Sequence, residues 1–187
     1  MKLTWFGHSA FRLEFGKTVL LIDPFLKGNP TFEGAKLDFA KAIAGTTHIA
    51  VTHGHDDHIG SSVEICQATG ATLVSNYEVC MYLAGLGVKN ISPGNHGGEI
   101  AFGDFSIAFV NAWHSSSATV DGRLRYMGNP AGYVVRTSAG RSLLHMGDTG
   151  IHSDMALTQE LYAPEVGIVP IGDRFTMGAR QAALACR

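Results

Sequence analysis

Residues with the chemistry to bind a metal crowd the stretch IAVTHGHDDHIG, residues 49–60. Three histidines and two aspartates fall within six positions, directly after an apolar, β-branched run. Side chains two positions apart share one face of an extended chain, so His53 and His55 are predicted to project together. Asp57 and His58 enter the next predicted helix and can turn toward a neighbouring point. A solvated turn is the alternative, but imidazole and carboxylate donors in the order H-x-H-x-D-H favour a site for an ion such as Zn²⁺.

Four further residues are candidates because each lies at or just beyond the end of a predicted strand. His114, in AWHSSS, and Asp148, in MGDTG, are a loop histidine and a turn aspartate when taken alone. Downstream of the histidine cluster both become candidate ligands, and one bridging carboxylate can hold two cations. His8, in GHS, has either a substrate-facing role or a packing role. Asp23, at the end of LLIDP, either caps a turn or orients a ligand imidazole through its second ring nitrogen.

The elements that must position these residues are mostly strands, with helices between them. Alternation of apolar residues and the placement of glycine and proline predict the strands and the helices. We expect two mixed sheets packed face to face with helices outside. The predicted strands are 2–6, 10–15, 18–23, 48–52, 71–75, 98–102, 105–113, 131–137, 141–147 and 166–172, and the predicted helices are 37–44, 59–69, 78–87, 154–162 and 179–185.

Length and composition narrow the class of protein. A chain of 187 residues fits one domain that buries roughly 70% of its unfolded surface. A net charge of −2 gives no electrostatic reason to expect nucleic acid. No apolar run approaches the ~20 residues of a membrane span, and the first residues lack the pattern of a signal peptide. Three widely spaced cysteines without a C-x-x-C pattern indicate a reducing cytoplasm, and none has a histidine partner that would support a cysteine nucleophile.

Four motifs along the chain resemble the metallo-β-lactamase superfamily. WFGHSAFRLEFGKTVLLIDP, VTHGHDDHIG, AWHSSS and LLHMGDTG occur in the order typical of its small metal-dependent hydrolase branch. That branch is similar to ascorbate-6-phosphate lactonase and to N-acyl-phosphatidylethanolamine phospholipase D. The resemblance implies an α+β fold, a four-layer αβ/βα sandwich with the site at one sheet edge. It also implies a single hydrolase domain over residues 1–187.

The same resemblance implies a ligand for each position of a binuclear site. His53, His55 and His114 match the imidazoles of the first metal. Asp57 and His58 match ligands of the second metal. Asp148 matches the carboxylate that bridges both ions. We expect one or two Zn²⁺ ions, with Mn²⁺ or Fe as alternatives.

The sequence departs from the family pattern near its C-terminal end. The family supplies a last histidine to the second metal on a late strand, and this chain has no histidine after His152. The branch often has a histidine where GDRFTMG has Arg174. Because the sequence stops at ARQAALACR, which is typical of the middle of an amphipathic helix, we expect either a truncated C-terminal part or a second metal that lacks a ligand.

The function implied is hydrolysis by a metal-activated hydroxide on an ester, lactone or phosphodiester. Asp57 would orient the nucleophile or accept its proton, and His8 or the second metal would stabilise the leaving group. The substrate is expected to be a small molecule whose anionic or ester group meets Arg123, Arg125 and Tyr126 in a variable polar loop. The alternative is that the loop carries its arginines for solubility alone. A homo-oligomer is an alternative to a monomer.

The alternative function is a metal-binding but non-hydrolytic member of the same superfamily. One version is a degenerate scaffold in which the metal only stabilises the fold. The other is a redox di-iron domain. That version typically has glutamate in H-x-E-x-D-H, whereas this chain has His55.

Overall fold

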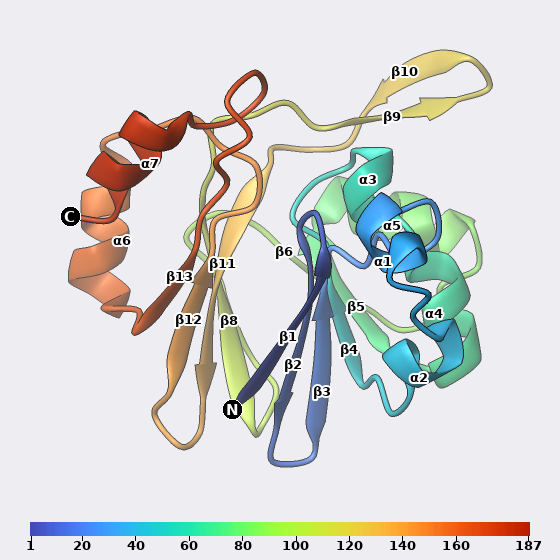
Figure 1. Ribbon diagram of the computed structural model, residues 1–187. Helices are drawn as coiled ribbons and strands as arrows, with labels where there is room; N and C mark the ends of the chain where they lie inside the picture. The colour runs from blue at the N-terminus through green and yellow to red at the C-terminus, as the bar shows by residue number, and fades with distance from the viewer. The chain divides into compact units, whose positions relative to one another are not determined.

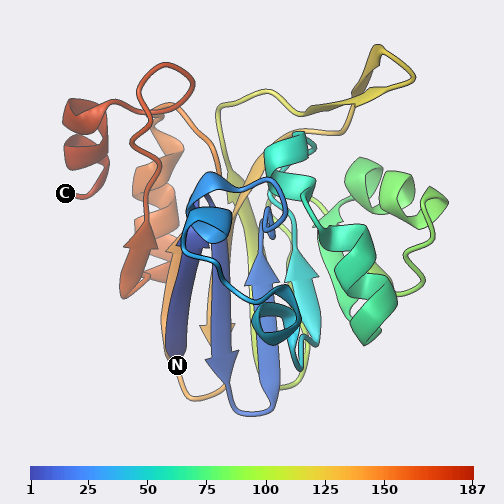
Figure 2. The same ribbon diagram turned by 45° about the vertical axis from the view of Figure 1, so that its right-hand side comes forward.

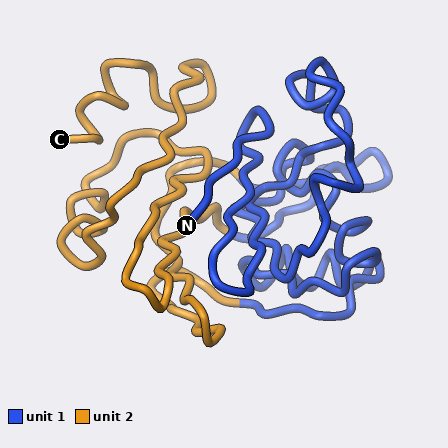
Figure 3. The backbone as a smooth tube through the Cα atoms, turned by 60° about the horizontal axis from the view of Figure 1, so that its bottom comes forward, with its two compact units in different colours: residues 1–93, 116–128 blue, residues 94–115, 129–187 orange.

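The computed structural model describes residues 1–187, which form two compact units. Each unit consists of two segments of the chain. Unit 1 comprises residues 1–93 and 116–128, and unit 2 comprises residues 94–115 and 129–187 (Figure 3). No helix of the chain combines the length and the apolar character needed to cross a membrane. The assignment of residues 1–187 to one domain stays a prediction.

Unit 1 contains a six-stranded mixed sheet whose strands follow their order in the chain. The first three strands form antiparallel hairpins, and the third, fourth and fifth are parallel. As a result the first, third and fourth strands all run in one direction and end at the same edge. The strands are β1 (Lys2–Gly7), β2 (Ala10–Phe15), β3 (Thr18–Ile22), β4 (His48–Ala50), β5 (Thr72–Asn76) and β6 (Ile91–Gly94).

Five helices lie on one side of this sheet (Figures 1 and 2). Apolar side chains of the strands, such as Leu21, Ile49 and Leu73, pack into one core with Ile65 and Leu83 of the helices. Burial of this apolar surface stabilises the unit. The helices are α1 (Pro30–Gly34), α2 (Phe39–Ile43), α3 (Asp56–Ile59), α4 (Ser62–Thr69) and α5 (Tyr77–Gly85).

The predicted helix 59–69 is interrupted. Gly60 has a φ of 46° and ends α3, and α4 starts only at Ser62. A Cβ at Gly60 would lie 2.5 Å from the Cα of Phe25, so only glycine allows this close approach. The break lets the short α3, which carries Asp57 and His58, take its own direction.

The predicted polar loop after residue 115 contains a second, two-stranded sheet of unit 1. It is an antiparallel hairpin of β9 (Ser117–Val120) and β10 (Arg123–Tyr126). Its turn is Asp121-Gly122, with positive φ values of 51° and 71°, which is the sequence and backbone that a two-residue hairpin favours. Asp121-Gly122 therefore marks a hairpin here rather than an irregular loop.

Unit 2 contains a five-stranded mixed sheet in the order β13-β12-β11-β8-β7. Two helices pack on it through a core that joins Val110, Val134 and Leu144 of the strands with Met155 and Ala182 of the helices. The elements are β7 (Glu99–Ala101), β8 (Phe105–Asn111), β11 (Ala131–Thr137), β12 (Ser142–His145), α6 (Asp154–Tyr162), β13 (Val166–Ile168) and α7 (Ala179–Ala185). The predicted α+β class with two mixed sheets and accompanying helices is confirmed.

Candidate metal centre

The donors of unit 1 gather at one edge of its sheet. His8 follows β1, Asp23 follows β3, and the stretch from Thr52 to His58 follows β4. Because these three strands run in the same direction, their C-terminal ends meet at the same edge. Side chains beyond the C-terminal ends of neighbouring strands are well placed to share a ligand.

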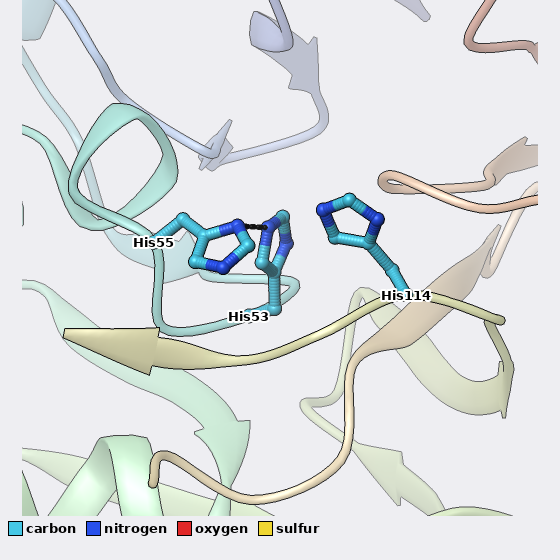
Figure 4. A group of neighbouring side chains, drawn as sticks. All are labelled: His53, His55 and His114. Atoms are coloured by element: carbon cyan, nitrogen blue, oxygen red, sulfur yellow. Dashed lines mark hydrogen bonds between the residues drawn. The ribbon is translucent and has the colours of Figure 1, made fainter. Parts of the chain in front are cut away.

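His53 and His55 point their ring nitrogens at each other. Nε2 of His53 lies 2.9 Å from Nδ1 of His55, and the ring centroids are 4.6 Å apart (Figure 4). Two nitrogens bound tetrahedrally to one Zn²⁺ at ~2.0–2.1 Å would be separated by about 3.3 Å. In this structure the two rings share a hydrogen bond, and a cation between them would have to replace it. The structure thus brings the two histidines together, and their roles as ligands stay a prediction.

A fully buried carboxylate, Asp23, orients His58. Its Oδ1 accepts a hydrogen bond from Thr52 N at 2.7 Å, and its Oδ2 accepts one from Thr52 Oγ1 at 2.7 Å. Nδ1 of His58 lies 2.8 Å from the same Oδ2. The carboxylate can only accept here, so Nδ1 of His58 carries the proton and Nε2 keeps its lone pair for a metal. The imidazole-orienting role, one of the two expected for Asp23, has its contact in the structure.

Thr52 connects this carboxylate to His53. Since its hydroxyl donates to Asp23, it accepts from Nδ1 of His53, which lies 3.0 Å away. This fixes the tautomer of His53 and leaves Nε2 for a metal. No role for Thr52 is predicted from the sequence, where its only signal is its position directly before H-x-H.

Asp57 and His8 form a second pair of donors at the edge. Nε2 of His8 lies 3.2 Å from Oδ2 of Asp57, and the hydrogen bond from His8 lowers the pKa of Asp57 to about 2. One donor atom from each of His8, Asp57 and His58 falls within 4.8 Å of the others. The two residues predicted to be catalytic are thus neighbours, whereas the adjacent Asp56 is exposed.

Gly54 sits where the donor segment touches the base of the β9–β10 hairpin. Its N–H donates to Oγ of Ser116 at 3.0 Å, and that hydroxyl donates to the carbonyl of Met127 at 3.0 Å. A Cβ at Gly54 would lie 2.2 Å from Cβ of Met127. The backbone of Gly54 is not left-handed. The need for glycine between the two histidines is therefore a steric one.

Unit 2 carries the other two predicted ligands. His114 follows β8 and Asp148 follows β12, and these strands run in one direction because both pair antiparallel with β11. Nε2 of His114 lies 3.8 Å from Oδ2 of Asp148, and their side chains are only 11% and 16% exposed. An imidazole and a carboxylate at this separation can share a cation as ligands.

Hydrogen bonds from main-chain N–H groups join the segment around His114 to the segment around Asp148. Trp113 N donates to Oγ1 of Thr149 at 2.8 Å, and Gly150 N donates to the carbonyl of Trp113 at 2.9 Å. An isolated antiparallel bridge joins Trp113 to Gly150. Thr149 is 1% exposed, so its hydroxyl is a buried link between the segments that precede and follow the ligands.

The other histidines and arginines have different surroundings. His145 is a buried residue at the end of β12. His48 begins β4, at the opposite end of the strand from His53. Arg174 is exposed and lies over the ring of Phe175. Arg123, Arg125 and Tyr126 are exposed on β10.

Comparison with known proteins gives consistent matches over the whole chain. The family model described as Beta-lactamase superfamily domain matches residues 2–187. A UPF0173 metal-dependent hydrolase of Methylocella silvestris is 58% identical over 187 residues, which are 100% of this chain and 79% of the relative. One from Chelativorans sp. is 52% identical over 189 residues, covering 100% of this chain and 80% of the relative.

Solved structures resemble the fold. Igni18, a metallo hydrolase from the hyperthermophilic archaeon Ignicoccus hospitalis, matches with a TM-score of 0.83 and 34% identity over 98% of this chain and 76% of its own. A possible metal-dependent hydrolase from Veillonella parvula matches with a TM-score of 0.70 over 94% of this chain and 73% of its own. At 18% identity, the second likeness concerns the fold alone.

Proposed function

We propose, on the premise that this chain belongs to the β-lactamase superfamily, that it is a metal-dependent hydrolase of ester, lactone or phosphodiester bonds. Its relatives from Methylocella silvestris and Chelativorans carry the description metal-dependent hydrolase and match over the full length of this chain. The bond type is our inference from the resemblance to the small hydrolase branch.

The observation that carries the proposal is the buried network behind the donors of unit 1. Asp23 is fully buried and, directly or through Thr52, holds the Nδ1 side of both His58 and His53. A buried carboxylate is costly to keep unless hydrogen bonds satisfy it. An arrangement that fixes two imidazoles with Nε2 as the available donor is what a metal site needs.

The ligand set we propose is the one that the resemblance to the superfamily implies. It assigns His53, His55 and His114 to a first ion and Asp57 and His58 to a second. Asp148 is proposed to bridge the two ions. We propose Zn²⁺, with Mn²⁺ or Fe as alternatives that the same nitrogen and oxygen donors accept. A bound divalent cation supplies Lewis acidity, since it polarises a substrate oxygen and lowers the pKa of water at the site toward ~7.

Asp57 is suited to orient the attacking water. Its Oδ2 lies 3.2 Å from Nε2 of His8, so the carboxylate already serves as a hydrogen-bond acceptor at this edge of the sheet. Of the two roles predicted for Asp57, we propose the orienting one.

The substrate we propose is a small anionic molecule in the cytoplasm. Arg123 and Arg125 are exposed on β10, and Arg125 is paired only loosely, at 3.9 Å from Asp121. Exposed guanidinium groups can bind a phosphate or carboxylate. The cytoplasmic location rests on the three cysteines, which are all free.

The test compares metal content with turnover. His53→Ala should lose bound metal by elemental analysis and fall to background on a panel of esters, lactones and phosphodiesters. His96→Ala, which removes a histidine bonded to the Pro130 carbonyl, should change neither. Turnover retained by protein stripped of metal would refute the mechanism. Bound metal without turnover on any probe would favour the non-hydrolytic alternative.

A further inference from the structure

His8 occupies a turn position that glycine would fill more easily. β1 and β2 pair up to Gly7 and Ala10, so His8 and Ser9 are the two residues of the hairpin loop. His8 has a φ of 50°, in the left-handed region that favours glycine at such turns. Strain of this kind persists where the surroundings enforce it, and it concentrates at functional sites.

The surroundings hold the His8 ring in one place. Nε1 of Trp5 donates to the carbonyl of His8 at 2.8 Å, which fixes the loop. The ring meets Phe25 edge to face at 5.9 Å between centroids, and it meets His58 in the same manner at 5.1 Å. Phe25 follows the segment that carries Asp23, the carboxylate that orients His58. The same wall therefore positions both imidazoles.

The donors of this cluster all belong to unit 1. Nε2 of His8 lies 3.2 Å from Oδ2 of Asp57, and donor atoms of His8, Asp57 and His58 lie within 4.8 Å of one another. The side chain of His8 is 36% exposed, so water can bond its Nδ1 while Nε2 faces the cluster. Two imidazoles and one carboxylate make a donor set that suits a divalent transition ion.

We propose that His8 is a direct ligand, beside Asp57 and His58, of the second cation. The inference rests on the proposed function for the presence of that cation, and it replaces the leaving-group role that the sequence suggested for His8. The alternative is that His8 only hydrogen-bonds Asp57 and acts through it.

The first test replaces His8, whose φ is positive, with glycine, which this turn favours. His8→Gly should fold with a metal-free thermal midpoint close to that of the wild type. Titration of metal-free protein with Cd²⁺, followed by ¹¹³Cd NMR, should give two resonances in the wild type. In His8→Gly the second ion should bind about 100-fold more weakly or worse. Removing a group that only hydrogen-bonds a metal ligand already lowers metal affinity ~10–100-fold, and removal of a ligand itself should cost at least as much. An unchanged second resonance and affinity would overturn the proposal.

A second variant separates a ligand from a hydrogen-bond partner. His8→Gln places an amide N–H near the position of Nε2 and can still donate to Asp57, but its nitrogen has no lone pair for a metal. We expect the second ion to bind to His8→Gln as weakly as to His8→Gly, and its ¹¹³Cd chemical shift to differ from that in the wild type. Wild-type affinity and shift in this variant would overturn the proposal and make His8 a positioning residue.

Controls distinguish this inference from the proposed function. His48→Gln changes a histidine of the same unit at the far end of β4, and both ions should bind as in the wild type. If wild-type protein binds a single Cd²⁺ and still hydrolyses a probe with its native metal, the His8 inference fails and the proposed function stands. If wild-type protein binds no metal, both fail.

Discussion

Unit 1 and unit 2 both place their proposed ligands beyond the C-terminal ends of strands, but they hold them by different means. In unit 1 a buried charged side chain, Asp23, accepts hydrogen bonds from the backbone, from a hydroxyl and from an imidazole. In unit 2 a buried hydroxyl, Thr149, and a short main-chain bridge join two segments. Side-chain support fixes the tautomer of a ligand, whereas main-chain support fixes only the path of the chain. Substitutions behind the ligands should therefore affect metal affinity more in unit 1.

The largest effect is expected for Asp23→Asn. Asparagine tolerates the positive φ of 45° but offers an N–H₂ group where Thr52 and His58 need an acceptor. We expect metal to bind about 10–100-fold more weakly, and metal-free protein to lose about 1–3 kcal/mol of unfolding free energy. Chelator competition and urea denaturation measure the two quantities.

A matched control for Asp23→Asn is Asp121→Asn. Asp121 also has a positive φ, of 51°, but its side chain is 90% exposed in the hairpin turn. This variant should match the wild type in both measurements. Equal effects of the two substitutions would mean that the buried carboxylate does not support the ligands.

Gly54→Ala should be the next most damaging change. The added Cβ would meet Cβ of Met127, which cannot swing away like the end of a flexible chain. Forcing an extra methyl into a packed site costs about 1–3 kcal/mol. Gly34→Ala in α1 has open space around its Cβ and should be neutral or stabilising. Thermal unfolding of both variants measures this difference. An unchanged midpoint in Gly54→Ala would mean that Gly54 does not pack closely against Met127.

Thr149→Val tests the support in unit 2. Valine keeps the shape but removes the hydroxyl that accepts from Trp113 N and donates to the carbonyl of Gly150. We expect a loss of about 1 kcal/mol in unfolding free energy, with metal affinity reduced less than in Asp23→Asn. A larger loss of metal than in Asp23→Asn would reverse the contrast between the two units.

The cysteines give an effect that is absent at neutral pH. Burial raises the pKa of Cys66 to about 11 and that of Cys80 to about 12, against 9.0 for an ordinary thiol. The folded chain then keeps protons that the unfolded chain releases, so the free energy of unfolding should be unchanged below pH 8 and should fall as pH rises from 9 to 11. At pH 8 a thiol reagent should label exposed Cys186 of unit 2 quickly and the two thiols of unit 1 only on unfolding. Equal labelling rates in the folded protein would contradict this.

The same contrast explains how much the sequence predicts. The donors of unit 1 form one contiguous motif after an apolar strand, so local periodicity suffices to place His53 and His55 together. His114 and Asp148 are separated by the whole of β11 and β12, and they became candidates only through the first motif and the resemblance. Their approach depends on strand pairing, which a single sequence does not specify.

Elements with weak local signals were missed. α1 has only five residues, and β6 includes Pro93, which usually argues against a strand. All four residues of β10 are exposed, so the strand lacks the alternation of apolar and polar residues that marks a half-buried one. Thr52 was missed because its role depends on Asp23, a partner 29 positions earlier in the chain.

The β9–β10 hairpin has a fixed base and an open tip. Asn76 donates to the carbonyl of Met127 at 2.9 Å, and Ser116 donates to the same carbonyl, whereas Leu124 and Tyr126 are 78% and 67% exposed. β9 contributes Ala118 to the core of unit 1, whereas every residue of β10 is exposed. Exchanging the residues of β10 alone would therefore recast the molecular surface there, while the core contact of β9 and the hydrogen bonds at the base stay intact.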